Sequence, residues 1–411
     1  MGLPESISAG DTAFVLAGAA LVMFMTPGLA LFYGGMVRQK NVLGTIMHSF
    51  FMIAVVSVLW ALVGYSLAFG PDRGHFIGGL EYCGLRGVGQ AASDYAATIP
   101  HLAFMIFQGM FAVITPALIT GAFAERMRFS SFLLFTVLWC LLVYCPVAHW
   151  VWGDGGWLGS LGVLDFAGGT VVHISSGAAA LAAAIVIGRR RDYGSSVLAS
   201  HSLPLTVLGA GILWFGWFGF NAASALAADG LASSAFVSTH LAAAAGALSW
   251  VAVEWMHRGS PTSLGAASGC VAGLVAITPA AGFVAPMPAV IIGLVAGAAC
   301  YGAVQLKWRA RYDDSLDVVG IHGAGGTLGA IATGIFASTA VNPAGADGLL
   351  YGNAGLVPAQ ALAAAATIAY SFIASVALLK LVDAIAGLRV TEQEEEAGLD
   401  LSQHREAAYG F

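Results

Sequence analysis

The stretch Asp165-Phe-Ala-Gly-Gly-Thr-Val-Val-His173 opens an apolar segment long enough to cross a lipid bilayer. An acidic residue ahead of such a segment is a typical helix N-cap, and His173 follows about two turns further along. A second histidine, His322, ends the stretch Asp317-Val-Val-Gly-Ile-His322 in another apolar segment. Titratable rings are costly inside a membrane and mark functional positions there. We therefore predict that His173 and His322 carry function.

The composition is that of a polytopic membrane protein. Hydrophobic residues make up 58% of the 411 residues and charged residues only 9%, which excludes an ordinary water-soluble protein. The segments lack strand-like alternation, so they are predicted to be helices. Runs able to cross about 30 Å of hydrocarbon predict eleven transmembrane helices, at residues 11–36, 42–69, 99–123, 128–147, 167–188, 201–219, 234–257, 262–281, 286–306, 319–337 and 356–386.

Most basic residues fall on one side of these spans, and positive charge marks the cytoplasm. They are Arg38, Lys40, Arg126, Arg128, Arg189 to Arg191, Arg258, Lys307, Arg309, Arg311, Arg389 and Arg405. Only Arg73 and Arg86 fall on the other side, and Lys380 lies inside the last span. The N-terminus is therefore predicted to lie outside the cell and the C-terminus inside.

The two histidines lie at equivalent places, in the fifth and tenth spans. Two halves of five spans each, followed by a last helix, form an inverted repeat, the arrangement in which transporters place the substrate path at the repeat interface. The fold class predicted is thus an all-α membrane protein with two inverted five-helix repeats. Residues 1–388 form its transmembrane domain, and residues 389–411 form a tail.

Several residues allow two interpretations. Asp165 is predicted to cap a helix, and its carboxylate would also favour cations near an outer vestibule. Each intramembrane histidine is either a structural ring satisfied by its surroundings or part of a pair that hydrogen-bonds a small polar guest and passes a proton. A metal site would need a further ligand, and Asp165 is a poor one at about two turns' distance. His149 is most simply a hydrogen-bonded structural residue.

Motifs along nearly the whole chain resemble those of ammonium transporters of the Amt type, in the Amt/Mep/Rh superfamily. They are Tyr33-Gly-Gly-Met-Val-Arg-Gln-Lys-Asn41, Ala124-Glu-Arg-Met-Arg-Phe129, Asp165 to His173, Gly216-Trp-Phe-Gly-Phe-Asn-Ala-Ala-Ser224, Asp317 to His322 and Gly387-Leu-Arg-Val390. Ala223 departs from the family pattern, where a glycine is common.

The resemblance implies a homotrimer with one pore in each subunit. It also implies recruitment of NH4+ outside, its deprotonation near a gate, and passage of NH3 through an apolar pore, with a proton relayed separately in many members. The residues that match the family's motifs are Phe107, Phe111, Trp152 and Ser224 for the external ammonium site, Phe111 and Phe220 for the gate, and Trp217, His173 and His322 for the pore lining.

The tail from residue 389 onward would by composition be disordered. The resemblance implies instead an ordered cytoplasmic segment that packs under a neighbouring subunit and helps a PII-type signalling protein to dock. A multi-pass protein of the cell (inner) membrane is expected, with ammonium or ammonia as substrate and with no nucleic-acid partner, cofactor, metal or catalytic residues. An ammonium sensor that signals through the tail is the alternative, whereas no signature supports an enzyme.

Overall fold

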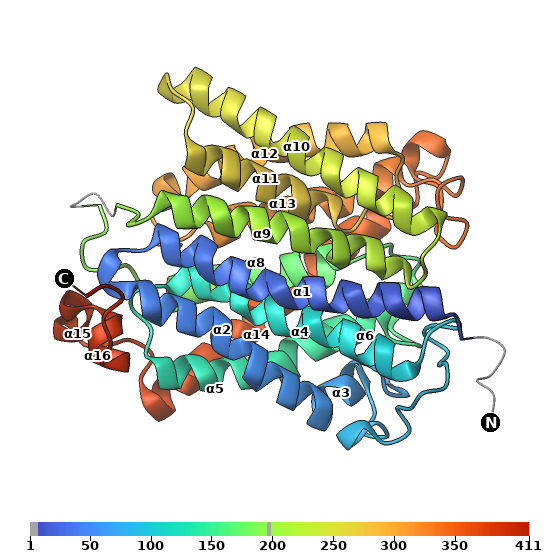
Figure 1. Ribbon diagram of the computed structural model, residues 1–411, viewed down its shortest axis with the longest axis horizontal. Coiled ribbons are helices and arrows are strands. Elements are labelled where there is room, and N and C mark those ends of the chain that lie inside the picture. Colours follow the sequence, from blue (N-terminus) through green and yellow to red (C-terminus); the bar gives the residue numbers. More distant parts are fainter. Residues whose placement is uncertain (1–6, 195–198, 411) are drawn as a thin grey trace.

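The computed structural model describes residues 7–194 and 199–410, and almost all of the regular structure is helical (Figure 1). In this part of the chain, ten helical spans are long and apolar enough to cross a membrane. They are Ala9–Met36, Gln39–Phe69, His101–Phe123, Phe129–Ser160, Gly169–Ile187, Leu203–Ala225, Gly230–Arg258, Pro286–Ala310, Val319–Phe336 and Leu356–Ala386. The expected span at residues 262–281 is the shorter apolar helix α11 (Ser263–Ile277), which ends before a turn. The prediction of an all-helical membrane protein is confirmed.

Several spans consist of more than one helical segment. The second contains η1 (Gln39–Asn41), α2 (Val42–Leu59), η2 (Trp60–Gly64) and α3 (Tyr65–Phe69), and the fourth contains α5 (Phe129–Trp139), η4 (Cys140–Tyr144), α6 (Cys145–Trp152) and α7 (Trp157–Ser160). The fifth joins η5 (Gly169–Ile174) to α8 (Ser175–Ile187), and the sixth joins α9 (Leu203–Ala222) to η6 (Ala223–Ala225). When α11 is counted as the eighth span, the tenth joins η7 (Val319–Gly323) to α13 (Ala324–Phe336). The continuous spans are α1 (Ala9–Met36), α4 (His101–Phe123), α10 (Gly230–Arg258), α12 (Pro286–Ala310) and α14 (Leu356–Ala386).

Four of these segments, η2, η4, η5 and η7, are π-helical turns. A π-turn inserts an extra residue into the helix and is often found at functional sites. His173 lies in η5 and His322 in η7, so each histidine-bearing span departs from α-helical geometry in the same way. The sequence predicted continuous helices at these places.

The contacts between helices repeat in the two halves of the chain. Helices α1 and α9 are the first spans of the two halves, and they pack along each other (Figure 1). Helix α4 contacts α1, α2 and α8, and α11 correspondingly contacts α9, α10 and α13. The fifth and tenth spans meet through η5 and η7. This pattern matches the two five-helix halves predicted from the sequence, with α14 as the additional last helix.

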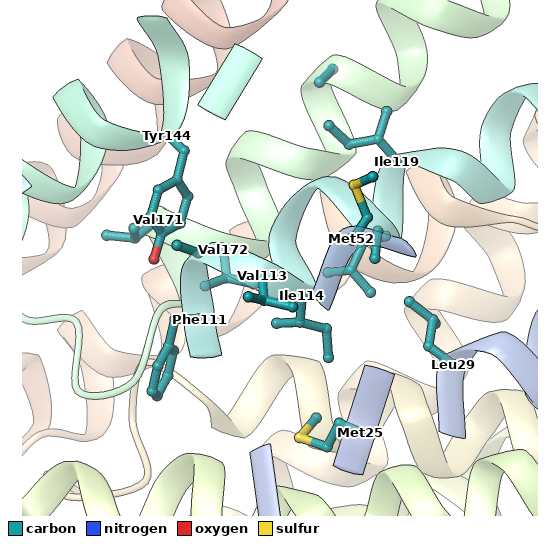
Figure 2. Packing of buried hydrophobic residues seen from close by; sticks show 14 of the residues in the cluster. Met25, Leu29, Met52, Phe111, Val113, Ile114, Ile119, Tyr144, Val171 and Val172 are labelled. Atoms are coloured by element: carbon teal, nitrogen blue, oxygen red, sulfur yellow. The ribbon is translucent and has the colours of Figure 1, made fainter. Parts of the chain in front are cut away.

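Small residues allow the fifth and tenth spans to approach closely. A Cβ added at Gly177 would lie 2.3 Å from Gly323 Cα, so the two backbones leave no room for a side chain there. Around this contact the interior is apolar. Side chains of α1, α2, α4 and η5 gather in one cluster (Figure 2), among them Met25, Leu29, Met52, Ile114 and Val172.

The bundle has two distinct ends (Figure 1). One, here called the loop-side end, carries the hairpin of β1 (Asp72–Arg73) and β2 (Ile77–Gly78), the turn η3 (Cys83–Leu85) and helix α7. Another short turn, η8 (Leu349–Tyr351), precedes α14. The other end, here called the tail-side end, carries α15 (Glu392–Ala397) and α16 (Leu399–His404).

The tail is ordered, contrary to what its composition suggests, and it contacts its own chain. Asp400 accepts hydrogen bonds from the backbone N–H groups of Leu43 at 3.0 Å and Gly44 at 2.8 Å, so it caps α2. Lys40 donates to the Glu396 carbonyl at 2.6 Å. The carboxylate of Glu395 accepts the Arg191 N–H at 2.8 Å. Helices α15 and α16 thus have specific partners on the bundle.

Glu125 lies at the centre of a buried charge network beside this tail. Its side chain is fully buried and forms ion pairs with Arg38 at 3.0 Å and Arg190 at 3.2 Å. Arg190 also pairs with Asp313 at 2.8 Å. Although burial acts in the opposite direction, Arg190 and Arg38 hold the pKa of Glu125 below its usual value. Both arginines lie on other segments, far from Glu125 along the chain, and they supply the counter-charge for its buried carboxylate.

Candidate functional site

The two predicted histidines meet in the middle of the protein. Nδ1 of His173 and Nδ1 of His322 lie 3.2 Å apart, and the ring centroids are 5.2 Å apart. Both rings are buried, with exposed fractions of 1% and 4%. One Nδ1 must donate and the other accept, so two neutral rings here must be opposite tautomers. Nε2 of His173 has no hydrogen-bond partner among the described residues.

Local packing sets the position of these rings. A Cβ added at Gly326 of α13 would lie 2.9 Å from the Cβ of His173, and a Cβ at Gly169 would lie 2.5 Å from the ring of Pro279. Trp217 of α9 stacks on His173 with centroids 5.4 Å apart, while its indole N–H donates to the Thr278 hydroxyl at 2.9 Å. The imidazole is therefore held between close-packed backbone on one side and an anchored indole on another.

A narrow cavity of about 10 Å³ adjoins the two histidines, which is roughly one water-sized probe. Its other lining residues are almost all apolar: Met25, Leu29, Phe32, Ile114, Leu118, Val172, Leu213, Trp217, Phe220 and Val271. They come from α1, α4, η5, α9 and α11. Such a lining offers no replacement for the hydration shell of an ion, and the imidazoles are its main polar groups.

Aromatic rings continue from the histidines toward the loop-side end. Phe220 lies against His173 at 6.0 Å and against Phe111 at 4.3 Å between centroids, and both phenylalanines are buried. Phe111 in turn contacts Phe107 at 5.0 Å and Trp152 at 6.0 Å, each edge to face. The structure therefore brings these predicted site residues into one series of ring contacts.

Ser224 lies one helical turn beyond Phe220, in η6. Its hydroxyl donates to the Phe220 carbonyl at 2.8 Å, which leaves the oxygen lone pairs available as acceptors. The neighbouring Ala223 packs closely against Gly18 of the first span. A Cβ added at Gly18 would lie 2.3 Å from Ala223 Cβ and 3.6 Å from a ring carbon of Phe107. The methyl group of Ala223 thus helps to pack α9 against α1 at the level of Phe107.

Asp165 caps the turn that carries His173, as predicted. One carboxylate oxygen accepts N–H groups of Gly168 at 2.8 Å and Gly169 at 2.7 Å, and the other accepts those of Thr170 at 2.8 Å and Val171 at 3.1 Å. Its backbone carbonyl also accepts the indole N–H of Trp152 at 2.9 Å. Asp165 therefore links the helix of the central histidine to an aromatic residue nearer the loop-side end.

Asp314 forms a second acidic cap, which was not predicted from the sequence. It precedes His322 by the same number of residues as Asp165 precedes His173, and its Oδ2 accepts the Val319 N–H at 2.7 Å. Burial raises the pKa of Asp314 to about 6, and its Oδ1 has no partner in the described part of the chain. Lys307 donates to the Asp314 carbonyl at 2.9 Å. The equal spacing from the two histidines was the signal that could have identified it.

The fold and this arrangement of residues agree with comparisons to known proteins. The sequence profile of the Ammonium Transporter Family matches residues 13–409. The chain belongs to this family, whose members are transport proteins and not enzymes, and it is a multi-pass membrane protein with ammonium or ammonia as its substrate class.

Its similarity to individual members extends over the whole length. An ammonium transporter of Bacillus subtilis is 59% identical over 401 residues, which cover 97% of this chain and 98% of that protein. The crystal structure of Saccharomyces cerevisiae Mep2 has a TM-score of 0.90 at 40% identity and covers 95% of this chain and 89% of its own. A structure described as a sensor Amt protein has a TM-score of 0.89 at 28% identity, covering 96% and 98%.

Proposed function

We propose that this protein recruits NH4+ at its loop-side end and conducts NH3 past the histidine pair. The observation that carries the proposal is the unbroken series of rings from Trp152 through Phe111 and Phe220 to His173, which ends in an apolar cavity. The loop-side end then faces outward and the tail-side end faces the cytoplasm, as the distribution of basic residues predicts.

The ammonium site is formed by Phe107, Phe111, Trp152 and Ser224. A cation against these ring faces gains about 0.5–2 kcal/mol from cation–π attraction. The Ser224 hydroxyl accepts one N–H bond, which potassium cannot donate. The carboxylate of Asp165 adds a favourable potential while it caps η5. Together these groups favour a cation that donates hydrogen bonds.

Beyond this site the ion must lose a proton, because the stacked rings of Phe111 and Phe220 form a dry gate. An intact ion in the apolar cavity loses several kcal/mol of hydration, whereas neutral NH3 does not. NH3 then passes Trp217 and hydrogen-bonds to His173 and His322, and it takes up a proton again on the cytoplasmic side. The paired imidazoles also offer a separate path for the released proton.

The tail from residue 389 is proposed to be a regulatory segment of a homotrimer in the cell membrane, with one pore in residues 1–388 of each subunit. Its ordered contacts with η1 and α2 place it beside the buried Glu125 network. A PII-type signalling protein docking there would act on the cytoplasmic mouth of the pore. The family resemblance is the basis for both the trimer and this partner.

The experiment is to measure ammonium and potassium currents in proteoliposomes, together with uptake of a labelled ammonium analogue. A carboxylate at the central position, in His173→Asp or His322→Asp, should admit potassium because a fixed negative charge stabilises a whole cation there. Replacing both histidines by leucine should abolish ammonium-dependent current and leave potassium excluded. Folded Asp variants that exclude potassium, or a double leucine variant with full current, would contradict this assignment.

A sensor role is the second candidate, favoured by the likeness to the sensor Amt structure. A pure sensor binds ammonium and rearranges its tail without flux. Uptake of the labelled analogue by the wild-type protein distinguishes the two functions directly, since only a transporter accumulates it inside the vesicles.

A further inference from the structure

The buried His149 is hydrogen-bonded to the partly exposed Asp72 at the loop-side end. Nε2 of His149 lies 3.0 Å from an Asp72 carboxylate oxygen, and Nδ1 lies 2.9 Å from the Ala68 carbonyl. The histidine side chain is fully buried, while that of Asp72 is 24% exposed. Nδ1 faces a carbonyl oxygen and therefore carries the proton that it donates, while Nε2 is bonded to the Asp72 carboxyl group. The pair therefore joins a histidine of α6 to the side chain of Asp72 on the hairpin.

The surrounding loop is built around this pair. A Cβ added at Gly153 would lie 2.3 Å from His149 Nδ1, and one at Gly155 would lie 2.8 Å from Asp72 Cβ. The Gly155 carbonyl is bonded to His75 Nδ1 at 2.7 Å, and the backbone N–H of His75 donates to Asp72 at 2.8 Å. The segment at residues 153–156 thus wraps closely over His149 and Asp72.

Trp152 lies between this loop and the pore. It is the last residue of α6, less than one turn after His149, and the glycine loop follows it directly. Its indole bonds to the Asp165 carbonyl, and its ring contacts Phe111. His149 anchors α6 to α3 through Ala68 and to β1 through Asp72, three residues before Trp152.

We propose that Asp72 and His149 are positioning residues for Trp152, so that the hairpin fixes the aromatic wall of the ammonium site without touching the substrate. This inference rests on the proposed function. If Trp152 is displaced, only the external ammonium site is damaged. Binding of the cation is then weaker, while passage past the histidines is unchanged. The expected signature is therefore a raised KM with an unchanged maximal rate.

The test compares Asp72→Ala with Asp72→Asn in proteoliposome uptake of the labelled analogue. In Asp72→Ala the imidazole loses its anchor, and we expect KM to rise about tenfold with the maximal rate within about twofold. In Asp72→Asn a neutral His149 donates to the Ala68 carbonyl and accepts from the asparagine amide, so both bonds of the ring survive. Only the His75 N–H, which shares the same Asp72 oxygen, loses its acceptor. KM should then stay within about threefold of wild type.

Glu81→Gln is the matched control, because it breaks the exposed ion pair of Glu81 with Arg73 on the same hairpin and should leave KM unchanged. Hydrogen exchange of residues 153–156 gives a readout independent of transport, and it should accelerate in Asp72→Ala only. An unchanged KM in Asp72→Ala, a fall in maximal rate alone, or equal losses in the Ala and Asn variants would overturn the proposal. No uptake by the wild-type protein would instead refute the transport function.

Discussion

Removing the carboxylate of Asp165 should destabilise the turn that carries the central histidine. Four backbone N–H groups bond to its two oxygens at 2.7–3.1 Å, and the side chain is almost fully buried. An unsatisfied buried donor costs about 1–3 kcal/mol. Water entering the vacated space would satisfy some of the four, so Asp165→Ala should lower the free energy of unfolding by about 4–6 kcal/mol.

Asp165→Asn separates the cap from the charge. Its amide oxygen still accepts the N–H groups of Gly168 and Gly169, but its NH2 group then faces the N–H groups of Thr170 and Val171. About half of the bonds are lost, so we expect a loss of about 2–4 kcal/mol and partial transport.

The assay is SDS-induced unfolding of the purified protein alongside uptake in proteoliposomes. If both variants unfold like wild type but neither transports, the carboxylate acts through its charge or as a proton carrier, and the capping argument fails. If Asp165→Asn were as stable as the wild type, the expected loss of half of the four hydrogen bonds would be wrong.

Three further predictions concern packing, the tail and the buried charges. Gly177→Ala should push the fifth and tenth spans apart and reduce uptake at least tenfold, whereas Gly323→Ala, whose added Cβ would meet nothing closer than 3.6 Å, should retain it; equal uptake by both variants would contradict the packing argument. Truncation after Gly387 should lower the Tm by a few degrees through lost caps and abolish inhibition by a PII-type protein, so persistent inhibition would exclude the tail as its docking segment. The two arginines lower the pKa of Glu125, so its contribution to the free energy of unfolding is present above a pH of about 4.3 and is lost as the pH falls through the folded-state pKa. Glu125→Gln should lower the free energy of unfolding by about 3 kcal/mol at neutral pH, and its Tm should fall less on acidification than that of the wild type.

Much of the bundle could be predicted from apolar runs alone, because lipid admits only helices or closed barrels. The meeting of His173 and His322 followed from their equivalent places in two halves. The π-turns could not be predicted, because the register of a helix depends on what packs against it, here Pro279 against Gly169. Helix propensity is a property of single residues and gives no information about contacts between distant segments.

The polar partners were the least predictable part of the structure. His149 and Asp72 are far apart in sequence, and His149 alone indicated only a hydrogen-bonded structural role. Glu125 similarly forms ion pairs with Arg38 and Arg190, which lie on two other segments. Burial of a charge becomes tolerable only when tertiary structure supplies the counter-charge, so sequence spacing does not reveal it. Asp314 was accessible in principle, because it repeats the spacing of Asp165.

The cap that Asp400 provides for α2 also bears on how the chain is made. Residues 43 and 44 belong to the second span, but the Asp400 carboxylate that accepts their N–H groups is translated only after the last span, α14. Until then the first turn of α2 has no acceptor from the tail. The side-chain oxygen of Asn41 likewise lacks the Leu399 N–H, which donates to it at 2.8 Å in the folded protein. Closure of the tail-side end therefore requires that all the spans up to residue 386 have already been synthesised.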